Sequence, residues 1–184
     1  MTFITTFTGK HFNPIEVEKE KIDIRDIAHA LSLMCRANGH VKNFYSVAQH
    51  SISCCIEAKE RGYSEKIQIA CLLHDASEAY LSDITRPIKP KLTEYLAIEE
   101  NLQDIIWDKY LEEPLTEEER EKVFEIDDDI LSYEFKLLMP KSISENYKNV
   151  ISKPSLHFVD PIIIENKFIE LMNRENINNS VIAY

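Results

Sequence analysis

Glycine is scarce in this chain, and that scarcity limits the folds open to it. Only three of the 184 residues are glycine, whereas average usage of about 7% would give about 13. Sandwiches and barrels need many tight turns, and tight turns need glycine. Gly9, Gly39 and Gly62 also lie too far apart for a glycine-rich phosphate-binding loop. The chain is therefore expected to be helical.

Hydrophobic periodicity and capping residues predict how the helices are arranged along the chain. Ser46 with Gln49, and Thr116 with Glu119, have the spacing of capping boxes at helix starts. The first twenty or so residues suit a short strand or an arm, and they are too few for a domain. We expect helices at about residues 23–34, 46–61, 64–81, 93–111, 116–140 and 160–176. The prediction is an all-α, single-domain helical bundle of six or more helices, over residues 1–184, with its core at about 22–140.

Net charge and cysteine content limit the binding partners that the protein can have and indicate the cellular compartment in which it works. The chain has 21 Lys and Arg against 32 Asp and Glu, a formal net charge of −11. Binding to nucleic-acid polymers or anionic membranes rests on Lys and Arg, so the sequence argues against both. No apolar run approaches the ~18 residues of a membrane span. The four cysteines lie in apolar patterns without a C-x-x-C pair, which predicts buried free thiols in a cytoplasmic protein.

The segment from Ile67 to Tyr80 contains the most informative conflict in the sequence. It is strongly apolar, yet His74 and Asp75 stand in its middle and Glu78 follows one turn later. On one helix these three side chains would project to one region. Burying an ionised carboxylate without a partner costs roughly several kcal/mol, so each buried carboxylate needs a positive partner. A metal ion is the most economical partner, because it holds imidazole and carboxylate together.

Two other predicted helices also point a polar side chain inward. His50 lies on a largely apolar face, four residues before Cys54. Asp127 shares a stripe with Val123, Ile130, Leu131 and Glu134, so that Asp127 faces inward while Asp128 and Asp129 turn away. Each residue alone has a plainer interpretation, because an inward histidine is usually a satisfied core residue and an acidic run is usually solvated. Together with the His74–Asp75 doublet, they favour one shared cation.

The order His, His-Asp, Asp on successive helices resembles the HD-domain metal-dependent phosphohydrolases. Within that family, the chain resembles one branch in particular, which includes the 5′-deoxynucleotidases and, close to them, the small phage dATP triphosphohydrolases. The resemblance covers about residues 8–140. The segments that carry it are residues 8–14 (TGKHFNP), 26–32 (DIAHALS), 45–51 (YSVAQHS), 72–80 (LLHDASEAY), 83–89 (DITRPIK) and 125–127 (EID).

The resemblance implies a role for each matching position. His50, His74, Asp75 and Asp127 match the four ligands of a metal ion. Glu78 matches the catalytic carboxylate, and Asp83 a second acidic residue near the scissile ester. Arg36 and Lys89 match residues that hold the phosphates. The mixed nitrogen and oxygen ligand set suits Zn, Mn, Co, Fe or Ni without deciding among them.

Two departures from the branch shape the functional prediction. Ala37 follows Arg36 where the deoxynucleotidases have a tryptophan, which puts their substrate preference in doubt. The stretch between Asp75 and Asp127 contains no histidine, which favours one ion over two.

The resulting hypothesis is a 5′-deoxynucleotidase, in which water attacks the α-phosphorus of a deoxyribonucleotide. A dNTP triphosphohydrolase is the alternative reaction, and a non-catalytic nucleotide sensor is an alternative of another class. The resemblance also implies a homo-oligomer.

Overall fold

Helices dominate the computed structural model, which describes residues 2–141 and 150–173. The prediction of an all-α bundle is confirmed. The N-terminal arm forms a small antiparallel hairpin, β1 (Ile4–Thr5) with β2 (His11–Phe12), in which Ile4 lies opposite Phe12. The α-helices of the described residues are α1 (Ile24–Leu33), α2 (Val47–Glu60), α3 (Glu65–Leu72), α4 (Glu78–Leu81), α5 (Thr93–Tyr110), α6 (Glu117–Leu138) and α7 (Pro161–Met172). Short 3₁₀ turns stand at Lys19–Lys21, Arg36–Gly39 and Lys89–Lys91.

The two predicted capping boxes are confirmed, and they place the starts of the two helices that matter most for the site. The Ser46 hydroxyl accepts from the backbone N–H of Gln49, while the Gln49 side chain accepts from that of Ser46. Thr116 and Glu119 make the same reciprocal pair at the start of α6. These caps satisfy backbone donors that a helix start leaves unpaired.

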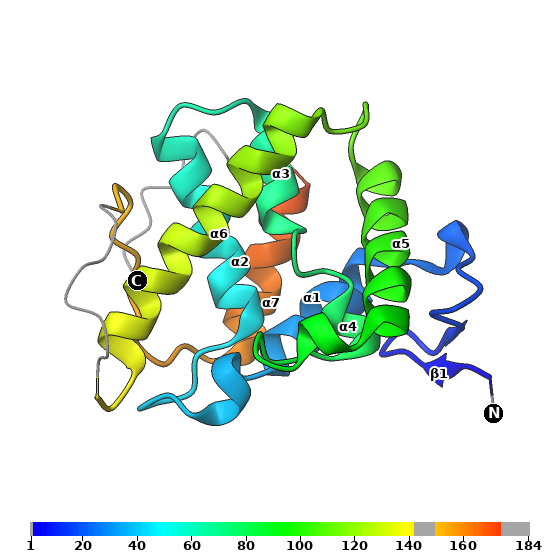
Figure 1. The fold of residues 1–184 in the computed structure, drawn as a ribbon, viewed down its shortest axis with the longest axis horizontal. Helices are drawn as coiled ribbons and strands as arrows, with labels where there is room; N and C mark the ends of the chain where they lie inside the picture. Colours follow the sequence, from blue (N-terminus) through cyan, green and yellow to red (C-terminus); the bar gives the residue numbers. More distant parts are fainter. Residues whose placement is uncertain (1, 142–149, 174–184) are drawn as a thin grey trace.

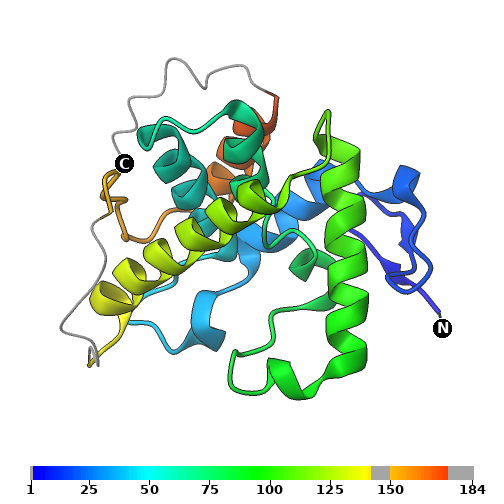
Figure 2. The same cartoon turned by 45° about the horizontal axis from the view of Figure 1, so that its top comes forward.

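Helix α2 lies at the centre of the bundle. It contacts α1, α3, α6 and α7, and nearly all of its side chains are buried. Figure 1 shows α6 crossing in front of α2, with α5 on the other side of the molecule near the N-terminal hairpin. Figure 2 shows the loop between α4 and α5 extending along the same side as α5. A polar side chain on the inner face of α2 is therefore surrounded by other helices.

The predicted helix at 64–81 is not continuous. Helix α3 ends at Leu72, residues 73–77 form turns, and α4 begins at Glu78. The side-chain amide of Gln103, on α5, bridges the break: Nε2 donates to the carbonyl of Leu73 (2.8 Å) and Oε1 accepts from the N–H of Ser77 (3.1 Å). These two bonds take the place of the single backbone bond, from the N–H of Ser77 to the carbonyl of Leu73, that an uninterrupted helix would make. His74 and Asp75 consequently lie in a turn rather than on a helix face.

A second buried network fastens the segment at Ile151 and Ser152 to α2. The carboxylate of Glu57 accepts from the backbone N–H groups of both residues (3.2 and 2.9 Å) and from Arg61 Nε (2.8 Å). Arg61 also donates to Asp129 Oδ2 (2.9 Å). The sequence analysis predicted that Asp129 turns away from the interior, which was wrong: Asp129 is buried against Arg61.

None of the helices in residues 2–141 and 150–173 is both long and apolar enough to cross a membrane. All four cysteines are free thiols; three of them are buried, and Cys35 is partly exposed.

Candidate metal centre

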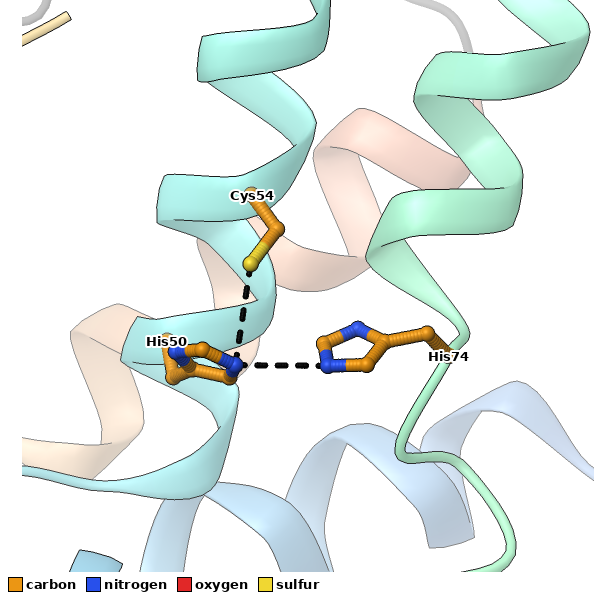
Figure 3. Close-up of side chains that lie close together, drawn as sticks. All are labelled: His50, Cys54 and His74. Carbon is orange, nitrogen blue, oxygen red and sulfur yellow. Dashed lines mark hydrogen bonds between the residues drawn. The ribbon is translucent and has the colours of Figure 1, made fainter. Parts of the chain in front are cut away.

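The structure brings side chains from α2, the 73–77 turn and α6 to one point beneath the surface. The Nε2 atom of His50 lies 3.2 Å from that of His74 and 3.0 Å from Asp127 Oδ1. Figure 3 shows the two imidazole rings approaching each other from separate segments, His50 from α2 and His74 from the chain beyond α3. His50 is fully buried, and the side chain of His74 is almost so.

Two carboxylates face the same point. Asp75 Oδ2 lies 3.3 Å from His74 Nε2 and 4.0 Å from His50 Nε2, and Asp127 Oδ1 lies 3.6 Å from His74 Nε2. Donors that share one transition-metal ion stand about 2.0–2.2 Å from it and so roughly 3–4 Å from one another. His50 Nε2, His74 Nε2 and Asp127 Oδ1 lie within 3.6 Å of one another, and Asp75 Oδ2 lies within 4.0 Å of both imidazole nitrogens, which are separations that a common ion would produce.

The other nitrogen of each ring is already hydrogen bonded. Both carboxylate oxygens of Glu134 lie close to His50 Nδ1, at 3.1 and 3.0 Å. His74 Nδ1 lies 2.7 Å from the backbone carbonyl of Cys71. Because carboxylate and carbonyl oxygens only accept, this hydrogen-bond network assigns the proton of each neutral ring to Nδ1. The lone pair of each Nε2 then faces the shared point.

This arrangement gathers acceptors, and acceptors attract a cation. Two Nε2 lone pairs and an oxygen of Asp127 converge within 3.6 Å. They are compatible at such separations only when a metal ion or an added proton lies among them. The imidazoles and the carboxylates also shift one another's pKa values. Burial would lower the pKa of His74, but Asp75 and Asp127 raise it well above 6.5. Burial would raise the pKa of Asp127, but His50 and His74 hold it well below 3.8.

Cys54 lies one helical turn beyond His50 and contacts the same ring nitrogen. Its Sγ atom is 3.6 Å from His50 Nε2 (Figure 3). The ligand atoms of His50, Cys54 and His74 all lie within 4.8 Å of one another, so this buried group could hold a metal ion. Burial, reinforced by Asp127, raises the pKa of the Cys54 thiol well above 9.0. The sequence analysis placed Cys54 in the core and gave it no role, although its i+4 spacing from His50 was visible.

Glu78 lies close enough to Asp75 and Asp83 for both carboxylates to affect its charge. Glu78 is buried, and its Oε2 atom has no hydrogen-bond partner among the described residues. Burial, followed by the fields of Asp75 and Asp83, raises the pKa of Glu78 well above 4.5. Asp83 follows Ser82, whose φ of 71° lies in the left-handed region that costs energy for a residue with a side chain. The loop that carries Asp83 is thus held in a strained conformation at its start.

Of the two predicted phosphate-binding residues, Arg36 is the one in contact with the cluster. Its Nη1 atom donates to Asp75 Oδ2 (3.2 Å), and its Nε atom lies 3.9 Å from Glu134 Oε2. Lys89 is half-buried and pairs with Glu99 on α5, 2.7 Å away. Burial opposes the charge of Lys89, but the bond to Glu99 and the fields of Glu78 and Asp75 raise its pKa. Lys89 therefore lies near Glu78 and Asp75, but its ion pair is with Glu99.

Arg86, on the same loop as Asp83, contacts Asp127 of α6 through the carboxylate oxygen that does not approach His50. Its Nη2 atom lies 3.2 Å from Asp127 Oδ2 and its Nη1 atom 2.9 Å from Asp128 Oδ1, and its side chain is largely exposed. Each of the four candidate ligands thus has a second partner that orients it: Glu134 for His50, the Cys71 carbonyl for His74, Arg36 for Asp75 and Arg86 for Asp127. Such outer partners are typical of built metal sites.

Comparison with known proteins finds relatives whose names state no activity. No model of a known protein family matches the chain. The chain is 43% identical over 110 residues to the uncharacterized protein YfdR of Escherichia coli strain K12, across 60% of this chain and 59% of YfdR. It is 32% identical over 100 residues to the uncharacterized protein RCAP_rcc00048 of Rhodobacter capsulatus, across 52% of this chain and 51% of that protein. The matches thus span only a little over half the length of these curated relatives.

Proposed function

We propose that the chain is a metal-dependent nucleotide phosphohydrolase whose divalent ion is held by His50, His74, Asp75 and Asp127. One observation carries this proposal: the Nε2 atoms of two buried imidazoles stand 3.2 Å apart, each with its Nδ1 committed to an outer acceptor. We favour a ligand set with two carboxylates over one that includes Cys54. Burial opposes the charge of Asp75 and Asp127, but the neighbouring imidazoles hold the pKa of both carboxyl groups below its usual value, whereas burial raises the pKa of the Cys54 thiol.

The donor set fits a transition-metal ion. Two imidazoles with two carboxylates suit Zn, Mn, Co, Fe or Ni, and the four donors leave positions for water and for a phosphate oxygen. When bound, such an ion supplies Lewis acidity, which activates water and offsets negative charge on the phosphoryl group.

Glu78 is proposed to act as the base. Its free, buried Oε2 atom and its raised pKa suit a group that takes the proton from an attacking water. The water oxygen forms a bond to the α-phosphorus, and the bond from phosphorus to the 5′ oxygen of the sugar breaks. Asp83 is proposed to orient the attack or to return a proton to the departing 5′ oxygen.

Arg36 and Lys89 are proposed to bind the phosphate groups. The guanidinium of Arg36 already lies 3.2 Å from the candidate ligand Asp75, so a phosphate oxygen near the ion would meet it. Lys89 would have to exchange Glu99 for the substrate. Support for a nucleotide as substrate comes from the resemblance of residues 8–140 to the HD-domain phosphohydrolases.

Two substrates remain open for this centre. Cleavage of the same phosphorus–oxygen bond releases phosphate from a deoxynucleoside monophosphate or triphosphate from a dNTP. Ala37 in place of the tryptophan of the deoxynucleotidases favours keeping the triphosphate as a second candidate. The free thiols of all four cysteines are consistent with a cytoplasmic enzyme. A homo-oligomer remains a prediction from the resemblance.

One assay tests the function. The purified protein is incubated with each dNMP and dNTP in the presence of Mn²⁺, Co²⁺ or Zn²⁺, and the inorganic product is identified. We expect phosphate from a monophosphate, or triphosphate from a dNTP if the alternative holds, with neither product in excess chelator. Nucleotide binding without turnover by metal-loaded protein would contradict the enzyme and leave the sensor.

A further inference from the structure

We infer that Glu134 is a positioning residue, which sets the metal affinity of the site by holding His50 in the tautomer and orientation that expose Nε2. The inference rests on the metal site of the proposed function and adds a residue to which the sequence analysis gave no role. Glu134 lies on α6, seven residues after Asp127 and thus on the same face two turns away.

The contact between Glu134 and His50 is direct and shielded from water. Both carboxylate oxygens approach His50 Nδ1, at 3.1 and 3.0 Å, and the exposed fraction of each residue is at most 1%. A charged acceptor on Nδ1 keeps the proton there, so that Nε2 carries a lone pair. It also makes the ring more basic toward an ion at Nε2.

The charge of Glu134 is balanced from within the site. Arg36 Nε lies 3.9 Å from Glu134 Oε2, while Nη1 of the same guanidinium donates to Asp75 Oδ2. One buried cation therefore links the outer carboxylate of one candidate ligand to the carboxylate of another. Helix α6 supplies both Asp127 and Glu134, so a single rigid helix fixes a ligand and the support of its neighbour.

His29 and Glu165 provide a matched control. His29 Nδ1 lies 2.9 Å from Glu165 Oε2, which is the same kind of imidazole–carboxylate pair. It joins α1 to α7 rather than contributing to the metal centre. Glu165→Gln should therefore perturb a comparable hydrogen bond without affecting the affinity for metal.

The test measures Mn²⁺ and Zn²⁺ affinity by competition with a chromophoric chelator, in the full chain and its variants. Loss of an outer partner typically weakens metal affinity about 10–100-fold. Glu134→Gln keeps an acceptor but loses the charge, so we expect about a 10-fold loss, and about a 100-fold loss for Glu134→Leu. Glu165→Gln is expected to bind both ions like the wild type. Unchanged affinity in Glu134→Leu, with its helical circular dichroism intact, would overturn the inference.

A second readout does not depend on any variant folding. Nitrogen-15 NMR of the imidazoles in zinc-loaded wild-type protein should show His50 protonated at Nδ1 and bound through Nε2. Binding through Nδ1 would overturn the inference, because Glu134 would then face the wrong nitrogen. The two proposals fail separately: metal binding that depends on Glu134 without nucleotide hydrolysis refutes the activity alone, whereas a wild type that binds no ion refutes the metal centre itself.

Discussion

The Nε2 atoms of His50 and His74 face each other at 3.2 Å, although the two residues belong to different segments of the chain. Neither ring can resolve this contact by turning its other nitrogen inward, because each Nδ1 already meets an oxygen of Glu134 or Cys71. The proposed ion satisfies both lone pairs together, and the predictions below follow from that arrangement.

Replacing either imidazole should remove the ion. His74→Ala deletes one of four donors and leaves His50 and the two carboxylates without the geometry for tight binding. We expect the metal content of purified protein, measured by inductively coupled plasma mass spectrometry, to fall to background. His157→Ala, at an exposed position, is the control and should retain the wild-type content. Unchanged metal in His74→Ala would contradict the site.

Replacing the proposed base should separate catalysis from metal binding. Glu78→Gln keeps the size of the buried side chain but removes its capacity to accept a proton. We expect kcat to fall by about 10²–10⁴-fold with metal affinity retained. Glu100→Gln, on the exposed face of α5, should behave like the wild type. Equal loss of metal and activity in Glu78→Gln would assign Glu78 to holding the ion instead.

The stabilisation that metal gives to the fold should grow with pH. Burial opposes charging of His74, but Asp75 and Asp127 raise its pKa in the folded protein well above 6.5. A pKa raised by folding stabilises the metal-free protein below the unfolded value, about 6.5, and that stability is lost as pH rises through the folded value. Metal binding needs neutral imidazole and strengthens over the same range.

The gain in Tm on adding Mn²⁺ is therefore expected to increase from about pH 6 to about pH 8. Differential scanning fluorimetry of metal-free and metal-loaded samples at each pH measures it. A gain that shrinks with rising pH would show that the ion does not compete with protons at these imidazoles.

Cobalt can decide whether the Cys54 thiol joins the ligand set. A thiolate ligand gives Co²⁺ an intense near-ultraviolet charge-transfer band, whereas imidazole and carboxylate ligands do not. Because the proposed set is His50, His74, Asp75 and Asp127, we expect the Co²⁺ spectrum to lack that band. Cys54→Ser should then retain the wild-type spectrum. A strong band that disappears in Cys54→Ser would replace a carboxylate with sulfur in the ligand set.

The buried carboxylate of Glu57 should matter for stability but not for the site. It accepts from Arg61 and from the backbone of Ile151 and Ser152. One hydrogen bond to a charged acceptor contributes about 1.5–3 kcal/mol. The amide oxygen of a glutamine can still accept, so we expect Glu57→Gln to lower the free energy of unfolding by about the value of one such bond. Urea unfolding measures the change, with exposed Glu60→Gln as the control. Mn²⁺ affinity should be the same in both variants.

The helices could be predicted from the sequence because their signals are local. The capping residues Ser46 and Thr116 stand next to the helices that they start, and the inward phase of Asp127 follows from its own helix. The break after Leu72 could not be predicted, since it depends on Gln103, which is far along the chain. The predicted helix was therefore too long there.

In the candidate site, too, local signals could be predicted from the sequence and contacts between distant residues could not. Inward polar residues were visible as conflicts with an apolar pattern, and the structure places His50, His74, Asp75 and Asp127 together. The partner of His50, in contrast, is Glu134, 84 residues further along the chain, and no local pattern links the two. The role of these residues in hydrolysis stays a prediction.

Anomalous diffraction from crystals grown with Zn²⁺ tests the central claim most directly. The account predicts one strong peak at the zinc edge, within about 2.0–2.2 Å of His50 Nε2, His74 Nε2 and an oxygen each of Asp75 and Asp127. Crystals grown in excess Zn²⁺ that show no peak at this point, or a peak only elsewhere on the protein, would contradict it.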